Sequence, residues 1–204
     1  MDRRDAVKYI SVLMGSALVG GDAFLLGCKS NSGKTDWLSA ESVAYLDEIG
    51  ETILPRTKTP GAKDAQVGKF MQVMVNDCYE EGDQTAFKEG MDKLNDASKK
   101  KYDKTFMEAT PEQRKELLIA VDKEAKDYQK SIADYNRTED DKGSKDAKYV
   151  KQKKSPHYFT MMKQLTLLGF FTSKPGLTQA LRYTAVPGKF EGCIPYKKGD
   201  PAFA

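Results

Sequence analysis

The sequence has very few of the residues on which metal sites and nucleophilic active sites depend. Its 204 residues include one histidine, His157, and three cysteines. A metal site needs three or four such ligands, and a Ser/His/Asp or Cys/His arrangement would have to use this one histidine. His157 follows Pro156 near an expected helix start, where a partly exposed residue of the first turn is the simpler interpretation. We therefore expect no catalytic residue and no metal ligand.

Cofactor-binding motifs are also missing. The chain has no Gly-x-Gly-x-x-Gly or Walker pattern, and no Cys-x-x-Cys pair for an iron–sulfur cluster or covalent haem. Neighbouring acids such as Asp47 and Glu48, or Asp140 and Asp141, could do acid–base work, but solvated carboxylates are the commoner interpretation. The formal net charge of +3 is too small to indicate a nucleic-acid partner. We expect no cofactor in this chain.

Alternating β-branched segments and internal repeats are absent, whereas apolar residues recur at helical spacing. Ser39 and Thr110 stand at N-cap positions, and Gln113 can complete a capping box with Thr110. We expect five helices. The first follows Ser39 and ends at Pro55, the second runs from Val67 to Cys78, the third starts near Asp83, the fourth runs from Thr110 towards Tyr135, and the fifth runs from Ser155 to Phe171. A short helical piece is expected from Leu177 to Tyr183. The sequence thus predicts an all-α fold of about five helices. In the last long helix, the apolar period places Phe159, Met162, Leu165, Leu168 and Phe171 on a buried face.

Three segments of the chain are expected to be irregular. Residues 136–154 carry seven basic and four acidic residues without an apolar period, which favours an exposed loop. Residues 29–38 have the composition of a flexible tether. The C-terminal tail is rich in Pro, Gly and aromatic residues, and such a tail has to pack on its own helices or on a partner protein. Its candidate partner-interface residues are Phe170, Phe171, Tyr183, Phe190 and Tyr196.

The first 28 residues have the layout of an export signal. Arg3 and Arg4 precede an apolar run from Tyr9 to Gly27, and the segment ends at Cys28. A basic region followed by an apolar region is typical of a secretory signal, and the arginine pair indicates the twin-arginine variant. Residues 25–28 resemble a lipobox, in which Cys28 becomes lipidated. The alternative is an uncleaved hydrophobic anchor with an incidental cysteine.

Two cysteines remain after Cys28. In an oxidising compartment Cys78 and Cys193 could form a disulfide, while a buried free thiol on an apolar helix face is the other interpretation of Cys78. We interpret residues 1–28 as the signal segment, 29–38 as the tether and 39–204 as one helical domain.

Four segments carry a resemblance to a known family. They are ETILPRTKTPGAKDAQV from Glu51 to Val67, NDCY from Asn76 to Tyr79, LGFFTS from Leu168 to Ser173, and YTAVPGKFEGCIP from Tyr183 to Pro195. With these segments the chain resembles the gluconate 2-dehydrogenase subunit 3 family, the small subunit of periplasmic flavin-dependent alcohol and sugar dehydrogenases.

The resemblance implies a non-catalytic subunit. In the family a larger partner of the glucose-methanol-choline oxidoreductase type holds FAD and oxidises the substrate, and the small subunit stabilises it and brings the export signal for both. A cytochrome c is a candidate electron acceptor of such a complex. The lipobox departs from the family pattern and implies that this complex is exported, periplasmic and tethered to a membrane by lipid on Cys28. A stand-alone lipid-anchored binding protein, or an oxidoreductase in its own right, are the alternatives.

Overall fold

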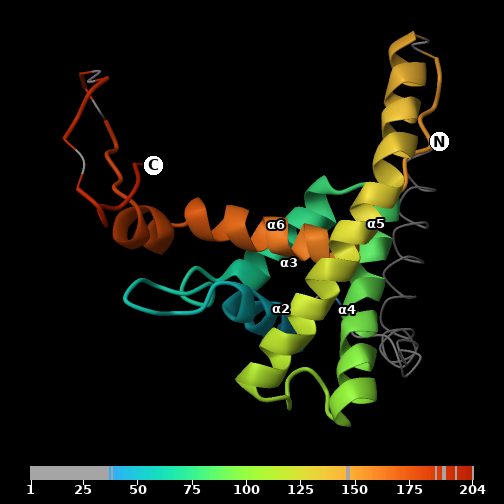
Figure 1. Ribbon diagram of the computed structural model, residues 1–204, viewed down its shortest axis with the longest axis horizontal. Coiled ribbons are helices and arrows are strands. Elements are labelled where there is room, and N and C mark those ends of the chain that lie inside the picture. Colours follow the sequence, from blue (N-terminus) through green and yellow to red (C-terminus); the bar gives the residue numbers. More distant parts are fainter. Residues whose placement is uncertain are drawn as a thin grey trace, which may run out of the picture. The chain divides into compact units, whose positions relative to one another are not determined.

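All regular structure in the described part of the chain is helical (Figure 1). The computed structural model describes Trp37 and residues 39–145, 148–186, 188–189, 192–195 and 197–203. The helices are α2 (Ala40–Ile53), α3 (Val67–Cys78), α4 (Glu81–Tyr102), α5 (Pro111–Lys145), α6 (Tyr158–Phe171) and the π-helix η1 (Gly176–Ala180). The predicted all-α fold is confirmed. Arg3, Arg4, Cys28, Phe190 and Tyr196 lie outside the described residues.

The described residues belong to the second of the two units into which the chain divides, Thr35–Ala204. None of the described helices combines the length and the hydropathy that a membrane span requires.

The predicted N-caps are present. Ser39 Oγ accepts a hydrogen bond from the backbone N–H of Ser42 at 3.2 Å, which satisfies one of the free donors at the start of α2. At α5, the N–H of Gln113 donates to Thr110 Oγ1 at 3.3 Å and the N–H of Thr110 donates to Gln113 Oε1 at 2.9 Å. This reciprocal pair is the capping box that the sequence predicts.

Helix α6 lies at the centre of the domain, because it contacts α2, α3, α4 and α5. Phe159, Met162 and Leu165 on α6 are buried, as the periodicity predicts, while Leu168 and Phe171 are exposed, contrary to it. The buried residues of α6 join those of the other helices in one hydrophobic cluster. Burial of such side chains is the main term that holds helices of modest propensity together.

Helices α2 and α3 are joined by a partly buried polar contact. The backbone N–H of Gly68 donates to Asp47 Oδ1 at 2.7 Å. Burial raises the pKa of the Asp47 carboxyl, and the hydrogen bond from Gly68 counteracts part of that rise. Asp47 is therefore a structural acceptor between two helices rather than the solvated carboxylate expected from the sequence.

The charged segment 136–154 is not the loop that the sequence predicts. Helix α5 continues to Lys145, and residues 148–154 return alongside its end, as the orange part of Figure 1 shows. Asn136 bonds the returning backbone twice, through Nδ2 to Lys154 O at 3.0 Å and through Oδ1 to Lys154 N at 2.9 Å. We call residues 136–154 the arm.

Glu139 holds the arm closed. Its buried carboxylate accepts hydrogen bonds from Lys142 Nζ at 2.8 Å, Gln152 N at 2.9 Å and Tyr149 Oη at 2.9 Å. These donors, with Lys142 the strongest, lower the pKa of Glu139 to about 2. Side-chain and backbone donors thus replace the apolar contacts that the sequence pattern lacks here.

The close approach of α4 and α6 generates a stability prediction. A Cβ at Gly90 would lie 2.2 Å from the Cβ and Cγ atoms of Tyr158. We expect Gly90→Ala to lower the free energy of unfolding by about 1 to 3 kcal/mol, because packed helices have to move apart. Chemical denaturation of the purified domain measures this change.

Gly82→Ala on the same helix is the matched control. A Cβ at Gly82 would meet only Ser155 Oγ, at an ordinary 3.5 Å. That variant should be unchanged or more stable by up to about 1 kcal/mol, from the higher helix propensity of alanine. Equal stability of the two variants would contradict the packing described here.

Candidate functional site

The loop between α2 and α3 is ordered by two carboxylates. Glu51 Oε1 accepts from the N–H of Arg56 at 2.8 Å, and Glu51 Oε2 accepts from the N–H of Lys63 at 2.9 Å. Asp64 Oδ2 accepts from the N–H of Gly61 at 2.8 Å and pairs with Arg56 Nε at 3.0 Å. We call residues 54–66 the proline loop. Its tip, residues 55–59, is exposed, and the contacts of Glu51 before the tip and of Asp64 after it fix the conformation of the loop.

Gly61 is required by the close approach of Glu51. A Cβ at Gly61 would lie 2.5 Å from a Glu51 carboxylate oxygen and 2.6 Å from the backbone nitrogen of Arg56. Only a residue without a side chain leaves room for the carboxylate to reach both backbone donors. Glu51 and Gly61, which belong to the segment from Glu51 to Val67 that carries the family resemblance, therefore have a structural role in ordering the proline loop.

A partly buried ion-pair network ties the proline loop to α5. Glu48 on α2 pairs with Arg114 on α5 and with Lys63 of the loop. Arg114 also donates through Nε to Phe106 O at 2.8 Å and through Nη2 to Met107 O at 2.7 Å. Glu48 is therefore not the solvated carboxylate that the sequence suggests. Its three-way contact positions α2, α5 and the loop relative to one another.

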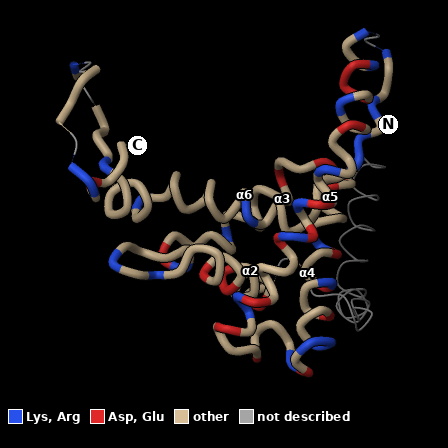
Figure 2. Tube along the Cα trace, viewed as in Figure 1, with Lys and Arg blue, Asp and Glu red and all other residues tan. Residues whose placement is uncertain are grey.

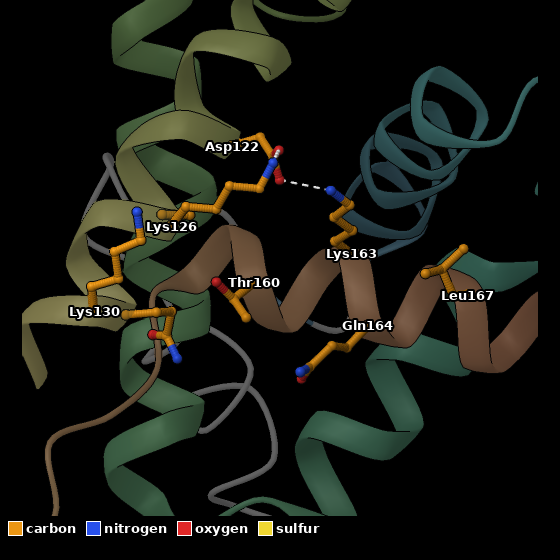
Figure 3. A pocket seen from close by; sticks show the side chains of 9 residues that line it. Asp122, Lys126, Lys130, Thr160, Lys163, Gln164 and Leu167 are labelled. Carbon is orange, nitrogen blue, oxygen red and sulfur yellow. Dashed lines mark hydrogen bonds and ion pairs between the residues drawn. The ribbon is translucent and has the colours of Figure 1, made fainter. Parts of the chain in front are cut away.

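A groove lies between α5 and α6 (Figure 3). It contains a cavity of 420 Å³ lined by Asp122, Ala125, Lys126, Gln129, Lys130, Thr160, Lys163, Gln164 and Leu167. Asp122 Oδ1 pairs with Lys163 Nζ at 2.7 Å, and Asp122 Oδ2 pairs with Lys126 Nζ at 2.7 Å. Hydrogen bonds from both ammonium groups lower the pKa of Asp122, so the carboxylate stays ionised near neutral pH.

A second cavity of 250 Å³ adjoins the first at the same ion pair. Asp122 and Lys163 line both cavities, and Ile53, Leu118 and Ile119 contribute to the second. Ile119 is 62% exposed. The groove therefore continues past the ion pair onto an apolar surface formed by α2 and α5.

The outer face of α6 is apolar and uncovered. Leu167, Leu168 and Phe171 are 39%, 47% and 40% exposed, and we call these three residues the apolar strip. Lys163 is the one charged residue of α6, so Figure 2 shows the rest of this helix in tan. Leu167 also lines the first cavity, which joins the strip to the groove.

The candidate interface aromatics divide into separate groups. Phe170 is 2% exposed and contacts the ring of Phe171 edge-to-face at 5.1 Å, so it belongs to the core and is not available to a partner. Phe171 and Tyr183 are exposed and remain available to a partner.

The short helix expected from Leu177 to Tyr183 is the π-helix Gly176–Ala180.

His157 caps α6 instead of lying within its first turn. Its Nδ1 accepts from the N–H of Phe159 at 3.2 Å, and its Nε2 lies 3.8 Å from Glu124 Oε1. Burial lowers the pKa of His157, and Glu124 counteracts this only in part. The histidine is therefore neutral near pH 7 and has a structural role at the helix start.

Cys78 and Cys193 are both free, exposed thiols in the structure, so the possible disulfide is not formed there. The buried environment considered for Cys78 is wrong, because its side chain points outward at the end of α3. No group of three or more His, Cys, Asp or Glu residues in the described part of the chain is placed to hold a metal ion.

The proline loop gives a second prediction. Replacing Glu51 by alanine removes the acceptor of two backbone donors, so we expect the free energy of unfolding to fall by about 1 to 2 kcal/mol. The amides of Arg56 and Lys63 should also exchange with solvent much faster. Hydrogen exchange of these amides, together with chemical denaturation, measures both effects.

The control for that variant is Glu89→Ala on α4. The exposed Glu89 carboxylate pairs with Lys93 at 3.4 Å on the same helix, and its loss should cost less than about 0.5 kcal/mol. Unchanged exchange of Arg56 and Lys63 in Glu51→Ala would show that the loop does not depend on this carboxylate.

Comparisons with known proteins agree with the resemblance seen in the sequence. A family model described as gluconate 2-dehydrogenase subunit 3 matches residues 40–188, from the start of α2 into the C-terminal tail. A search of curated proteins and a search of solved structures each returned no match. Because the family model covers well over half of the sequence, the chain belongs to the gluconate 2-dehydrogenase subunit 3 family, whose members are accessory subunits of a dehydrogenase complex.

Proposed function

We propose that this chain is a non-catalytic small subunit that binds and stabilises a larger FAD-dependent dehydrogenase of the glucose-methanol-choline type. The observation that carries this proposal is the apolar strip on α6. Leu167, Leu168 and Phe171 present a contiguous apolar surface next to an open groove. Apolar and aromatic side chains at the centre of an interface supply most of its binding energy.

The groove beside the strip can provide the polar edge of this interface. The Asp122–Lys163 pair lies between the two cavities, and Lys126 and Lys130 line the first of them. Interfaces typically surround an apolar centre with polar residues that exclude water. The proposed binding surface therefore consists of the apolar strip, the groove and the exposed Ile119.

A stand-alone binding protein is less well supported by the same cavity. Small-molecule sites are clefts or cavities that bury most of the surface of their ligand. The larger cavity is a groove that is open to solvent along the surface of α5 and α6, so a small ligand in it would keep much of its surface in water. This shape suits the edge of a protein interface better than an enclosed ligand site.

We propose further that the first 28 residues act for the whole complex. The Arg3–Arg4 pair would direct this subunit and its folded, FAD-loaded partner through the twin-arginine route, and lipid on Cys28 would hold the complex at a membrane. A cytochrome c is the proposed electron acceptor of the partner. The family assignment supports the association with a dehydrogenase, and the arginine pair and the residues before Cys28 support the export route and the anchor.

The binding surface is tested by the double variant Leu168→Asp/Phe171→Asp. Two charges on the apolar strip should lower the affinity for the partner by roughly 100-fold or more, since central interface residues each contribute about 2 kcal/mol or more. The measurement is co-purification from the native host, with the partner identified by its flavin absorption and its dehydrogenase activity.

Met107→Asp serves as the control, because Met107 is also an exposed apolar residue, 43% exposed, but lies in the connection between α4 and α5. It should retain the flavoprotein. Retention by the double variant, or isolation of the wild-type chain without any flavoprotein under gentle conditions, would refute the proposed interface.

The export proposal is tested by replacing Arg3 and Arg4 with lysine. Both this chain and its partner should then remain in the cytoplasm, which cell fractionation and dehydrogenase activity report. Cys28→Ala is the matched variant, and it should export the complex normally but release it from the membrane fraction. Export of the partner in the lysine variant would exclude a shared signal.

A further inference from the structure

The arm extends past the hydrophobic core of the domain. The last buried apolar residue of α5 is Ile132, and beyond it the only buried side chain of this helix is the carboxylate of Glu139. Helix α5 nevertheless continues to Lys145, with the returning segment alongside (Figure 1). The ordered arm therefore adds no apolar burial to the core, which points to a role at the surface.

The arm holds the excess positive charge of the molecule. It contains seven basic residues, namely Arg137, Lys142, Lys145, Lys148, Lys151, Lys153 and Lys154. Its four acidic residues are Glu139, Asp140, Asp141 and Asp146. The difference is three positive charges, which equals the formal net charge of the whole chain. The remaining residues are thus neutral overall, and an anionic surface would attract the protein by its arm (Figure 2).

Two of the acidic residues of the arm are occupied in holding its shape. Asp140 Oδ1 pairs with Lys151 Nζ at 2.9 Å and with Lys153 Nζ at 2.8 Å, so one carboxylate serves two ammonium groups. Glu139 is buried under the returning segment. Lys145, Lys148 and Lys154 are exposed on the outside of the arm.

The apolar and aromatic residues of the arm indicate what kind of anionic surface it would bind. Val150 is 80% exposed and lies in the run Lys148-Tyr149-Val150-Lys151. The one aromatic ring of the arm, Tyr149, is engaged, because its Oη donates to Glu139 and Lys142 Nζ lies 5.8 Å from its ring centroid. Just before the arm, Tyr135 lies under Lys154 Nζ at 4.9 Å. Base stacking needs free aromatic faces, whereas lysines around an exposed apolar side chain are typical of binding at the lipid interface.

We propose that the arm binds the surface of an anionic phospholipid membrane. The lysines interact with the lipid phosphates, and Val150 inserts at the level of the headgroups. This contact goes beyond the proposed lipid anchor and does not require it, because the charges and Val150 belong to the folded domain. It would add a second, salt-sensitive attachment that orients the domain on the membrane.

The test uses residues 35–204, the compact unit that contains every described helix and lacks both Cys28 and the apolar segment from Tyr9 to Gly27. Sedimentation with phosphatidylcholine vesicles, with and without phosphatidylglycerol, measures the partition coefficient. Binding should require phosphatidylglycerol and weaken as salt is added. The triple variant Lys145→Gln/Lys148→Gln/Lys154→Gln should partition about 100-fold less, at roughly fivefold per lysine near an anionic surface. Circular dichroism checks that the variant keeps its helices.

The matched control is Lys99→Gln/Lys100→Gln/Lys104→Gln, which removes three exposed lysines around the end of α4. It should change partitioning by no more than a few fold. Equal losses in the two variants would show that only net charge matters and would overturn the proposal, as would equal binding to pure phosphatidylcholine.

Two competitors separate the membrane from other anionic partners. Polyglutamate or DNA at equal charge concentration should displace the protein poorly, because neither offers an interface for Val150. Inorganic phosphate should act no more strongly than chloride at the same ionic strength. Efficient displacement by a soluble polyanion would assign the arm to an acidic macromolecule, and selective displacement by phosphate would assign it to a free anion, so either result would refute membrane binding.

Discussion

The structure depends on the burial of one helix. Helix α6 is apolar around most of its circumference, and a helix of this kind is stable in water only when its neighbours cover it. Helices α2, α3, α4 and α5 all pack against α6 and bury Phe159, Met162, Leu165 and Phe170. In the described part of the chain, the side chains of the apolar strip stay 39 to 47% exposed. The same property that organises the core therefore leaves a surface suited to a second polypeptide.

The polar contacts set the positions of the elements around this centre. Glu48 joins α2, α5 and the proline loop, and Asp122 joins α5 to α6. A partly buried carboxylate is costly unless its partners are in place, so such contacts fix geometry more than they add stability. In this subunit they keep the groove and the proline loop in a constant relation to the apolar strip, which a binding surface requires.

Much of the fold could be predicted from local rules, and the failures have physical reasons. The caps at Ser39 and Thr110 and the stripes of α3 and α4 follow from local sequence. The end of α5 does not, because it is held by Glu139 and Asn136 across the turn instead of by an apolar period. Periodicity also cannot tell which side of an almost wholly apolar helix stays open, so Leu168 and Phe171 were expected in the core. The roles of Glu48 and Asp47 depend on residues far away in sequence, which no local pattern reveals.

The length of α5 has a mechanical consequence. Asp122, in the groove, and Glu139, in the arm, lie on one uninterrupted helix, about 25 Å apart along its axis. A continuous helix of this length bends only gently, so the distance between the groove and the arm stays nearly constant. If an enzyme binds near one end of α5 and a bilayer contacts the other, this helix keeps the two at a fixed distance from each other. The subunit would then determine how far above the lipid its enzyme works, and in which orientation.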